Sequence, residues 1–310
     1  MNRVIAVFGP TASGKSSLAI LLAKELNGVI ISADSMQIYE EMNIGTAKPS
    51  SKELATVPHR LIDVCKPTDA FSVYDYKILA EAEIDRVLSK GQVPIVTGGT
   101  GMYFDALFFN TDFGEMKIDP KIRTELNLRA QAGEGSELLS ELAKIDPETA
   151  APLHEKDLKR IIRGLEVYLS TGTPLSVFKA NSKTNNSKYE FLKLFLNFKD
   201  RETLYQRINL RVDQMIEEGL VFETKTLLEK GYFNSPTASQ AIGYKELLPY
   251  FDGERTLVEC IEILKQKTRN YAKRQLTWFR RYSDANTIWM DQDPSPFQTA
   301  LQFYREFLGG

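Results

Sequence analysis

The hydrophobic positions in the first hundred residues form short runs that are separated by longer segments of helical spacing. Residues 4–8, 29–31 and 93–96 are β-branched or aromatic runs, which predicts three buried strands. Residues 17–26 and 72–90 carry apolar side chains every three or four positions and end close to a glycine, which predicts two helices. Because strands alternate with helices, we expect an α/β fold with a parallel sheet covered on both faces.

The middle of the chain has a different pattern. No run of strand type occurs there, and helical spacing recurs at residues 121–132, 137–145 and 158–170. Strand character returns at residues 191–198, and long helical patterns follow at residues 201–218 and 257–282. We therefore predict a catalytic core of residues 1–113 and 188–310, interrupted by a helical insertion domain of residues 114–187.

A glycine-rich loop follows the first predicted strand directly. It reads GPTASGKS and matches the phosphate-binding pattern G-x-x-x-x-G-K-[ST] in full. Glycines let backbone N–H groups surround phosphate oxygens, and the following helix presents its positive end. Lys15 is expected to reach terminal phosphates, and the Ser16 hydroxyl to ligate Mg²⁺. The predicted diphosphate or nucleotide site, of the type that binds ATP, comprises Gly9, Pro10, Thr11, Ala12, Ser13, Gly14, Lys15 and Ser16.

The sequence lacks a feature that most nucleotide-hydrolysing enzymes have. Such enzymes place an acidic Mg²⁺ ligand at the end of a later buried strand. Here the predicted strand at 93–96 is followed by Thr-Gly-Gly-Thr, without a carboxylate. The nearest imitation is Asp63, in a short segment that follows Arg60. This difference argues against a hydrolase.

One carboxylate does follow the second predicted strand. Asp34 comes three residues after the run at 29–31. Ligands of parallel sheets bind at the carboxyl ends of the strands, so Asp34 is expected to face the phosphate loop. From position alone two roles are equally possible. Asp34 either accepts a proton from an attacking amine or hydroxyl, or caps the turn or helix that follows.

Composition adds limits on the function. The chain has 310 residues with only two cysteines and two histidines, so we expect neither a disulfide framework nor a zinc cluster, as in a reducing cytoplasm. No apolar run approaches the roughly 18 residues that span a bilayer, and nothing predicts an obligate protein partner. The net charge of −2 argues mildly against nucleic-acid binding.

The charge is nevertheless unevenly distributed. Residues 263–283 contain seven lysines and arginines and no acidic residue. The same segment carries Tyr271, Trp278 and Phe279, and cationic groups with planar side chains are the usual contacts of looped RNA. We interpret the segment as an RNA-facing helix with Trp278 and Phe279 in the core, and the alternative is a solvated basic helix face.

Eight segments in order resemble the tRNA dimethylallyltransferase, or IPP transferase, family nearly from end to end. The segments are GPTASGKS at 9–16, ADSMQIY at 33–39, NIGTAKP at 43–49, PHRLID at 58–63, GGTGMYF at 98–104, KRIIRGLEVY at 159–168, QAIGYKE at 240–246 and TRNYAKRQLTWFR at 268–280. Two small departures are Ser16, where the family often has threonine, and Arg60, where a second histidine is common. Neither removes a chemical group that the reaction needs.

The resemblance implies transfer of a dimethylallyl group from dimethylallyl diphosphate to the exocyclic amine of the adenosine 3′ of the anticodon. The phosphate loop would then hold a leaving pyrophosphate, with Mg²⁺ as the cofactor. The family's general base corresponds to Asp34, the residue near the base and the allylic carbon to Thr100, and an arginine near the diphosphate to Arg211. For Arg211 a surface charge is an equally good reading.

The resemblance also implies a set of contacts with the anticodon stem-loop of tRNA, whose target adenosine must be unstacked first. A smaller basic group in the insertion domain would grip the stem. The implied tRNA-binding residues are Asp34, Ser35, Met36, Gln37, Gly101, Lys159, Arg160, Arg163, Gln240, Gly243, Tyr244, Lys245, Arg269, Lys273, Arg274 and Gln275.

Two other functions fit parts of the sequence. A small-molecule kinase would use the phosphate loop and an early carboxylate, but it would leave the basic segment without a role. A non-catalytic RNA-binding module would use the basic segment, but it would have no need of an intact phosphate loop.

Overall fold

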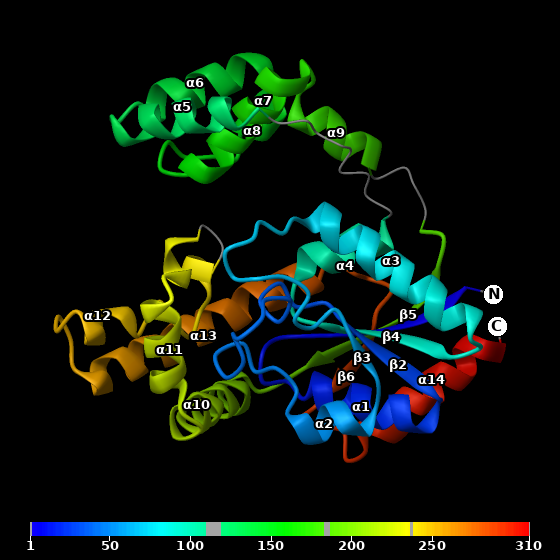
Figure 1. Cartoon of the computed structure of the whole chain (residues 1–310). Helices are drawn as coiled ribbons and strands as arrows, with labels where there is room; N and C mark the ends of the chain where they lie inside the picture. Colours follow the sequence, from blue (N-terminus) through cyan, green and yellow to red (C-terminus); the bar gives the residue numbers. More distant parts are fainter. Residues whose placement is uncertain (1, 110–118, 183–186, 236–237, 310) are drawn as a thin grey trace. The chain divides into compact units, whose positions relative to one another are not determined.

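The computed structural model describes residues 2–109, 119–182, 187–235 and 238–309. The chain divides into two compact units, which are drawn in Figure 1. Unit 1 comprises Met1–Phe104 and Lys188–Gly310, and unit 2 comprises Asp105–Ser187. The boundary predicted at residue 114 lies outside the described residues.

Unit 1 is built on a parallel sheet of six strands in the order β3-β2-β4-β1-β5-β6. The strands are β1 (Arg3–Phe8), β2 (Gly28–Ser32), β3 (His59–Arg60), β4 (Val93–Gly98), β5 (Glu190–Asn197) and β6 (Asn286–Trp289). The predicted α/β fold with a parallel, P-loop type sheet is confirmed. The two strands that the sequence pattern missed, β3 and β6, are the short strands at the two edges.

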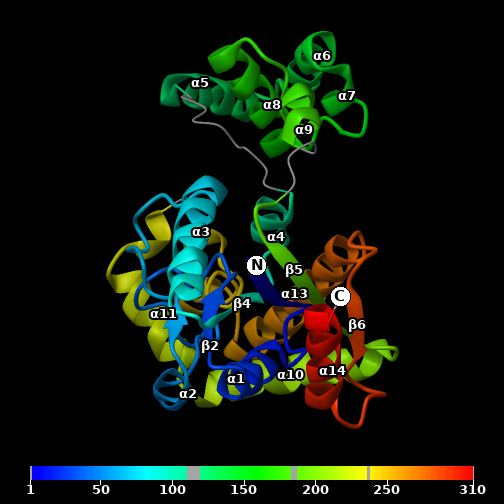
Figure 2. The same ribbon diagram turned by 90° about the vertical axis from the view of Figure 1, so that its right-hand side faces the viewer.

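Helices cover both faces of the sheet, because alternate residues of a strand point to opposite sides. Ile5 and Val7 of β1 pack in a cluster with residues of α1 (Lys15–Glu25) and α14 (Pro296–Gly309), which lie side by side in Figure 2. Phe8 lies on the other side, where its ring centroid is 5.2 Å from that of Phe104 and 5.0 Å from that of Phe279. Phe104 belongs to α4 (Gly101–Phe108) and Phe279 ends α13 (Leu257–Phe279).

The predicted helix at residues 72–90 is α3 (Val73–Ser89). Ser72 caps it in a reciprocal arrangement, in which the Ser72 hydroxyl accepts from Asp75 N and the Asp75 carboxylate accepts from Ser72 N. The helix packs on β2 and β4, on the side of the sheet away from α1. A shorter helix, α2 (Ser51–Thr56), precedes β3.

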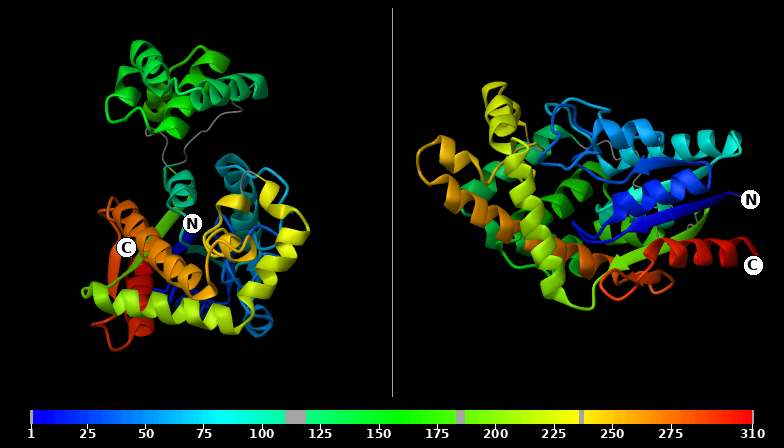
Figure 3. Two further views of the ribbon diagram at one scale, coloured as in Figure 1. Left: turned by 90° about the vertical axis from the view of Figure 1, so that its left-hand side faces the viewer. Right: turned by 90° about the horizontal axis from the view of Figure 1, so that it is seen from below.

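A helical lobe packs on the segment that follows β2. It contains α10 (Arg201–Glu217), α11 (Leu220–Glu229), the 3₁₀ turns η1 (Tyr232–Asn234) and η2 (Ala238–Gln240), α12 (Leu248–Phe251) and α13. Figure 3 shows α10 beside α13, the longest helix pair of the lobe. The buried residues Ile38, Tyr39 and Met42 join Val212 of α10 and Leu264 of α13 in one hydrophobic cluster. The lobe therefore fixes the path of the chain just beyond the carboxyl end of β2.

Unit 2 consists of helices, as the pattern of the middle segment predicted. They are α5 (Pro120–Gln131), α6 (Gly135–Ile145), α7 (Pro147–Ala150), α8 (Leu158–Thr171) and α9 (Leu175–Ser182). Leu138 and Leu142 of α6 pack against Ile161 and Leu165 of α8. Within the described ranges, no helix of either unit has the length and apolar character that crossing a bilayer requires.

Candidate active site

The phosphate loop connects β1 to α1, and its backbone angles are those of a loop whose N–H groups face a bound anion. Ala12 has φ 62° and Gly14 has φ 90°, and left-handed residues within a turn aim successive N–H groups toward one point. The loop is held from outside by Arg207 of α10, whose Nε donates to Ala12 O at 2.9 Å. Ser13 is fully buried, and its Oγ has no hydrogen-bond partner among the residues described.

Lys15 begins α1 and lies in a charged surrounding. Its Nζ donates to Pro10 O at 2.6 Å. Burial of the ammonium lowers the pKa of Lys15 from 10.5 to about 7; the charge of Arg211 adds to this effect and that of Asp34 opposes it. Near neutral pH the site therefore holds a lysine that gains its full charge when an anion arrives.

Asp34 is positioned by a tight junction between the ends of β2 and β4. Ala33 N donates to Thr97 O at 2.7 Å, and Thr100 N donates to Ala33 O at 3.1 Å. A side chain at Gly98 would place its Cβ only 2.1 Å from Ala33 O, so glycine alone permits this approach. The junction brings Asp34 to the same edge of the sheet as the phosphate loop, as predicted from its place after β2.

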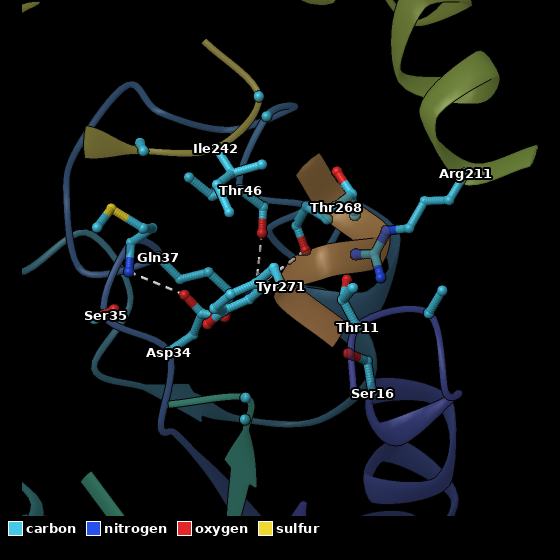
Figure 4. A pocket seen from close by; sticks show the side chains of 18 of the residues that line it. Thr11, Ser16, Asp34, Ser35, Gln37, Thr46, Arg211, Ile242, Thr268 and Tyr271 are labelled. Atoms are coloured by element: carbon cyan, nitrogen blue, oxygen red, sulfur yellow. Dashed lines mark hydrogen bonds between the residues drawn. The ribbon is translucent and has the colours of Figure 1, made fainter. Parts of the chain in front are cut away.

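The structure shows one of the two roles that the sequence left open for Asp34, the cap of the turn, and the role of proton acceptor stays a prediction. One carboxylate oxygen, Oδ1, accepts the Met36 N–H at 2.9 Å and so caps the turn. Figure 4 shows the Asp34 carboxylate at the active-site cavity. Its second oxygen, Oδ2, is therefore available to a ligand. Thr100 contacts the neighbouring residue and not the cavity itself. Its Oγ1 accepts the Ser35 N–H at 3.0 Å, and Thr100 is not among the residues that line the cavity. It supports the segment that carries Asp34.

These groups surround a cavity of about 330 Å³ at the carboxyl ends of β1, β2 and β4. Thr11, Ser16 and Arg211 lie on one side of it and Asp34 on the other (Figure 4). Apolar side chains of the helical lobe line the remaining wall: Ile208, Val212, Met215, Ile242 and Leu264. The cavity therefore combines a phosphate-binding side, a carboxylate and an apolar surface.

Arg211 and Tyr271 complete the polar part of the wall. Arg211 reaches the cavity from α10, and its surroundings lower its pKa, mainly through burial, against the opposing charge of Asp34. The side chain of Arg211 points into the cavity in Figure 4, which argues against a role as a surface charge. Tyr271 of α13 lies by Asp34 in Figure 4, and burial followed by the charge of Asp34 holds its pKa well above the ordinary value. Its hydroxyl stays protonated in any ordinary buffer.

Gln37 is fixed by its own segment. Its Nε2 donates to Thr46 O at 3.3 Å and Ala47 O at 3.1 Å, and its Oε1 accepts the Ser32 hydroxyl at 3.1 Å. Together with Ser35 and Met36 it lines the cavity, so the structure brings the predicted base-reading segment to the site.

Glu223 of α11, which sequence reasoning missed, anchors the loop that holds Gln37. Its carboxylate accepts N–H groups of Asn43, Ile44 and Gly45 at 2.9 to 3.2 Å. It also accepts the Tyr244 hydroxyl at 2.8 Å. Nothing near Glu223 in the sequence marked it, because its four donors lie 21 or more residues away.

Three of the residues predicted to contact tRNA also have structural roles. Tyr244 is fully buried, and Gly243 is buried with its N–H donated to Glu246 Oε2 at 3.0 Å. Gln275 is 5% exposed; its Oε1 accepts Thr11 N at 2.8 Å and its Nε2 donates to Gly99 O at 2.9 Å. Gln275 therefore joins the phosphate loop to the end of β4, and like Gly243 it lines the cavity.

Some of the other predicted tRNA contacts of unit 1 line the cavity, and the rest lie outside it. Gln240, Lys245 and Arg274 line the cavity. Arg269 donates to Asn209 Oδ1 at 2.6 Å, and Lys273 is exposed with its Nζ 5.7 Å from the centre of the Tyr205 ring. Gly101 lies under the ring of Trp278, and Phe279 is in the core.

The three predicted contacts of unit 2 all belong to α8. Lys159 and Arg160 are exposed. Arg163 donates to the buried carboxylate of Glu166 at 3.0 Å, and Arg123 lies 2.9 Å from the other oxygen of Glu166. The guanidinium of Arg163 thus balances a buried charge in its own unit.

The donor set at the loop fits Mg²⁺ only if a phosphate completes it. Ser16 lines the cavity and is exposed, and Mg²⁺ accepts hydroxyl, phosphate and water oxygens together. In the described part of the chain, no group of three or more histidine, cysteine or acidic residues forms a metal site. Asp63, the imitation of a hydrolase ligand, pairs with Lys48 outside the cavity.

Comparisons with known proteins agree with this arrangement. Residues 37–282 match the family model described as IPP transferase, and residues 2–70 match one described as isopentenyl transferase. A tRNA dimethylallyltransferase of Acetivibrio thermocellus is 48% identical over 293 residues, which cover 94% of this chain and 93% of that protein.

Solved structures are similar over the whole chain. The full-length tRNA isopentenylpyrophosphate transferase of Bacillus halodurans is 40% identical with a TM-score of 0.73, over 100% of this chain and 96% of that one. A eukaryotic dimethylallyltransferase acting on tRNA is 30% identical with a TM-score of 0.84, over 99% of this chain and 79% of that one.

Proposed function

The chain belongs to the IPP transferase family, and we propose that the cavity at the ends of β1, β2 and β4 is where its tRNA dimethylallyltransferase activity takes place. The dimethylallyl group moves from dimethylallyl diphosphate to the exocyclic amine of the adenosine 3′ of the anticodon, which yields isopentenyladenosine and pyrophosphate. The observation that supports this site best is that a phosphate loop and the carboxylate of Asp34 line one hollow together with apolar side chains.

The leaving group belongs at the phosphate loop. The allylic carbon–oxygen bond breaks and its electron pair passes to the diphosphate, so groups that neutralise this charge lower the barrier. Lys15, Arg211 and the N–H groups of the loop are the donors on that side of the cavity. When bound, Mg²⁺ supplies further charge neutralisation, with Ser16 and phosphate oxygens as the ligands.

The acceptor belongs at the opposite wall. The adenine nitrogen forms the new bond to the allylic carbon and gives up a proton, which the second oxygen of Asp34 accepts. An exocyclic amine is a poor nucleophile, so close positioning is as necessary as the base itself. The turn held by Met36 N and the support of Ser35 by Thr100 supply that positioning.

The finer parts of the proposal concern the partners. We assign the grip on the anticodon stem-loop to the exposed cations Lys273 and Arg274 with Gln240 and Lys245 in unit 1, and to Lys159 and Arg160 of the helical insertion in unit 2. Dimethylallyl diphosphate is the small substrate, ATP is a second polyphosphate that the same loop can hold, and a tRNA substrate places the enzyme in the cytoplasm.

A kinase is the best rival, since it would use the same loop and carboxylate. It is disfavoured because the apolar wall formed by α10, α13 and Ile242 fits a hydrocarbon chain better than a hydrophilic metabolite. A binding module without chemistry would leave the charged pair of Lys15 and Asp34 without a use.

Transfer of label separates these functions. The protein is incubated with Mg²⁺, unmodified tRNA and dimethylallyl diphosphate labelled in the allyl group. We expect label in the RNA, in an adenosine 3′ of the anticodon. An unlabelled RNA, together with phosphorylation of a metabolite from ATP, would overturn the proposal. Unlabelled RNA that still binds the protein would favour the binding module.

A further inference from the structure

Strands β5 and β6 end in a second hollow, the β5–β6 hollow, with a volume of about 500 Å³. Phe195 and Asn197 of β5 form its floor with Thr287 and Trp289 of β6. These four residues are register partners, Phe195 with Thr287 and Asn197 with Trp289, so their side chains share one face of the sheet. None of them lines the active-site cavity.

The hollow exists because α13, the helix that packs on this face of the sheet, ends before it reaches β6. The intervening residues Leu194, Leu196 and Ile288 point to the other face, where they pack in the cluster that contains α14. On the near face Phe279 covers Phe195, with 6.1 Å between the ring centroids, and α13 ends there. The edge strand β6 is therefore left open on one side.

Three cations line the opening: Lys199 just after β5, Arg201 at the start of α10 and Arg280 at the end of α13. The Lys199 ammonium lies 3.9 Å from the centre of a Trp289 ring, which holds it over the floor. Among the described residues, no carboxylate forms an ion pair with any of the three.

The acidic residues nearby are engaged elsewhere. Asp200 caps α10 by accepting the N–H groups of Glu202 and Thr203, and Asp291 accepts those of Lys199 and Asp200. Asp284 lies 2.6 Å from Lys193 Nζ. The carboxylates therefore order the backbone around the hollow, and none of them is among the residues that line it.

Like charges held together cost free energy unless an anion joins them. Burial and then the charge of Arg280 lower the pKa of Arg201, so the two guanidinium groups act on each other. Asn197 is 5% exposed, and its Oδ1 accepts Phe198 N at 2.9 Å, which leaves its amide nitrogen as a further donor at the floor. Guanidinium, ammonium and amide donors gathered in one place are the groups that bind an oxyanion.

We propose that the β5–β6 hollow is a second phosphate-binding site, and that it takes a backbone phosphate of the RNA substrate outside the reacting nucleotide. Guanidinium groups match the oxygens of a phosphate, and the ring of Trp289 gives a planar surface beside them. β6 lies two strands from β1, roughly 10 Å at ~4.8 Å per strand, which is within reach of the same RNA loop. The RNA source rests on the proposed function, whereas the phosphate chemistry does not.

The test compares two double variants of equal charge. Arg201→Gln with Arg280→Gln removes two charges from the hollow. Lys24→Gln with Arg305→Gln removes two exposed charges from α1 and α14, on the other side of the sheet. Binding of an unmodified anticodon stem-loop RNA is measured by fluorescence anisotropy over a range of salt concentrations, without dimethylallyl diphosphate.

We expect the hollow variant to bind RNA about five- to tenfold more weakly, and the slope of log K against log salt to fall by about 1. The control variant should stay within about twofold of the wild type. Because no transfer is measured, these results do not depend on the chemistry. Failure of the proposed function would appear separately, as absence of labelled RNA with the wild type.

A second arm tests free diphosphate as the source of the anion. In a Lys15→Ala background, inorganic pyrophosphate should raise the melting temperature through the remaining site. Loss of this rise in the hollow variant, with RNA binding unchanged, would keep the phosphate site and replace RNA by free diphosphate. Equal behaviour of the hollow and control variants in both arms would overturn the proposal.

Discussion

The active-site cavity and the β5–β6 hollow lie at the carboxyl edge of one parallel sheet, and they differ in their balance of charge. In the cavity, Lys15 and Arg211 face the carboxylate of Asp34. In the hollow, Lys199, Arg201 and Arg280 have no carboxylate partner among the described residues. A parallel sheet directs ligands to this edge, and the side chains that follow each strand decide what each position can do.

The difference separates chemistry from binding. A carboxylate close to two cations can accept a proton during a reaction, and a lysine with a pKa of about 7 changes its charge readily. Guanidinium groups do not exchange protons at ordinary pH, so they can only attract an anion. We therefore expect substitutions in the cavity to change the rate of transfer, and substitutions in the hollow to change only binding.

Asp34→Asn should give the largest effect. Asparagine keeps the size of the side chain and an oxygen for the Met36 N–H, but it cannot accept the proton of the amine. We expect kcat to fall about 10²–10⁴-fold with tRNA affinity within about twofold. Single-turnover transfer and RNA anisotropy measure the two effects. A matching loss of tRNA affinity would show that Asp34 mainly positions the base.

Lys15→Met should follow, with roughly a 100-fold loss in kcat/KM for dimethylallyl diphosphate and little change in RNA affinity. Lys15→Arg is the matched variant, because arginine keeps its charge at every pH used.

The same pair of proteins tests the pKa of Lys15. Bound diphosphate requires the charged ammonium, and above pH 7 the free site must first take up a proton. The pyrophosphate affinity of the wild type, divided by that of Lys15→Arg, should therefore fall about tenfold per pH unit above 7 and level off below it. A constant ratio between pH 6 and 9 would contradict the lowered pKa.

Glu223→Gln should have a smaller effect, confined to one wall of the cavity. The amide cannot serve all the N–H groups of residues 43–45, so the segment that holds Gln37 should loosen. We expect about tenfold higher KM for tRNA, unchanged KM for dimethylallyl diphosphate, and ~1–3 kcal/mol lower stability in urea unfolding. Equal rises in both KM values would mean that the anchor serves the whole cavity.

Arg280→Gln should give the smallest change, and in the opposite direction for stability. Removing one of two like charges should raise the melting temperature by about 1–3 °C without added anions. The value of kcat with saturating tRNA should stay within about twofold. A lower melting temperature would indicate that Arg280 has a structural role, and the contrast between the two sites would weaken.

Much of this protein follows from local sequence. The strands β1, β2 and β4 and the helices α1 and α3 form where short apolar runs and helical spacing predicted them, because those patterns report which faces of an element are buried. The phosphate loop was equally predictable, since its glycines and lysine act through a local turn. The place of Asp34 followed from the rule for parallel strands.

Other features were decided only by tertiary structure. β3 and β6 are too short for a pattern to mark them, and they exist because a longer strand is beside them. Glu223 and Arg207 reach loops 178 or more residues away in the sequence, as with the Glu223 bond to Gly45 N and the Arg207 bond to Ala12 O. Packing also buries Gln275 and Tyr244, which the sequence pattern did not indicate.

The pairing of charges around the β5–β6 hollow was likewise decided by tertiary structure. The sequence showed a basic segment at residues 263–283, but it did not show which of those cations are neutralised. Lys265 is paired with Asp213 and Glu262, whereas Arg280 joins Arg201 and Lys199 from distant segments. Local sequence determines which elements form, because burial patterns and turn geometry act between near neighbours. Only the packed chain decides which charges meet, because electrostatic partners are chosen by distance in space.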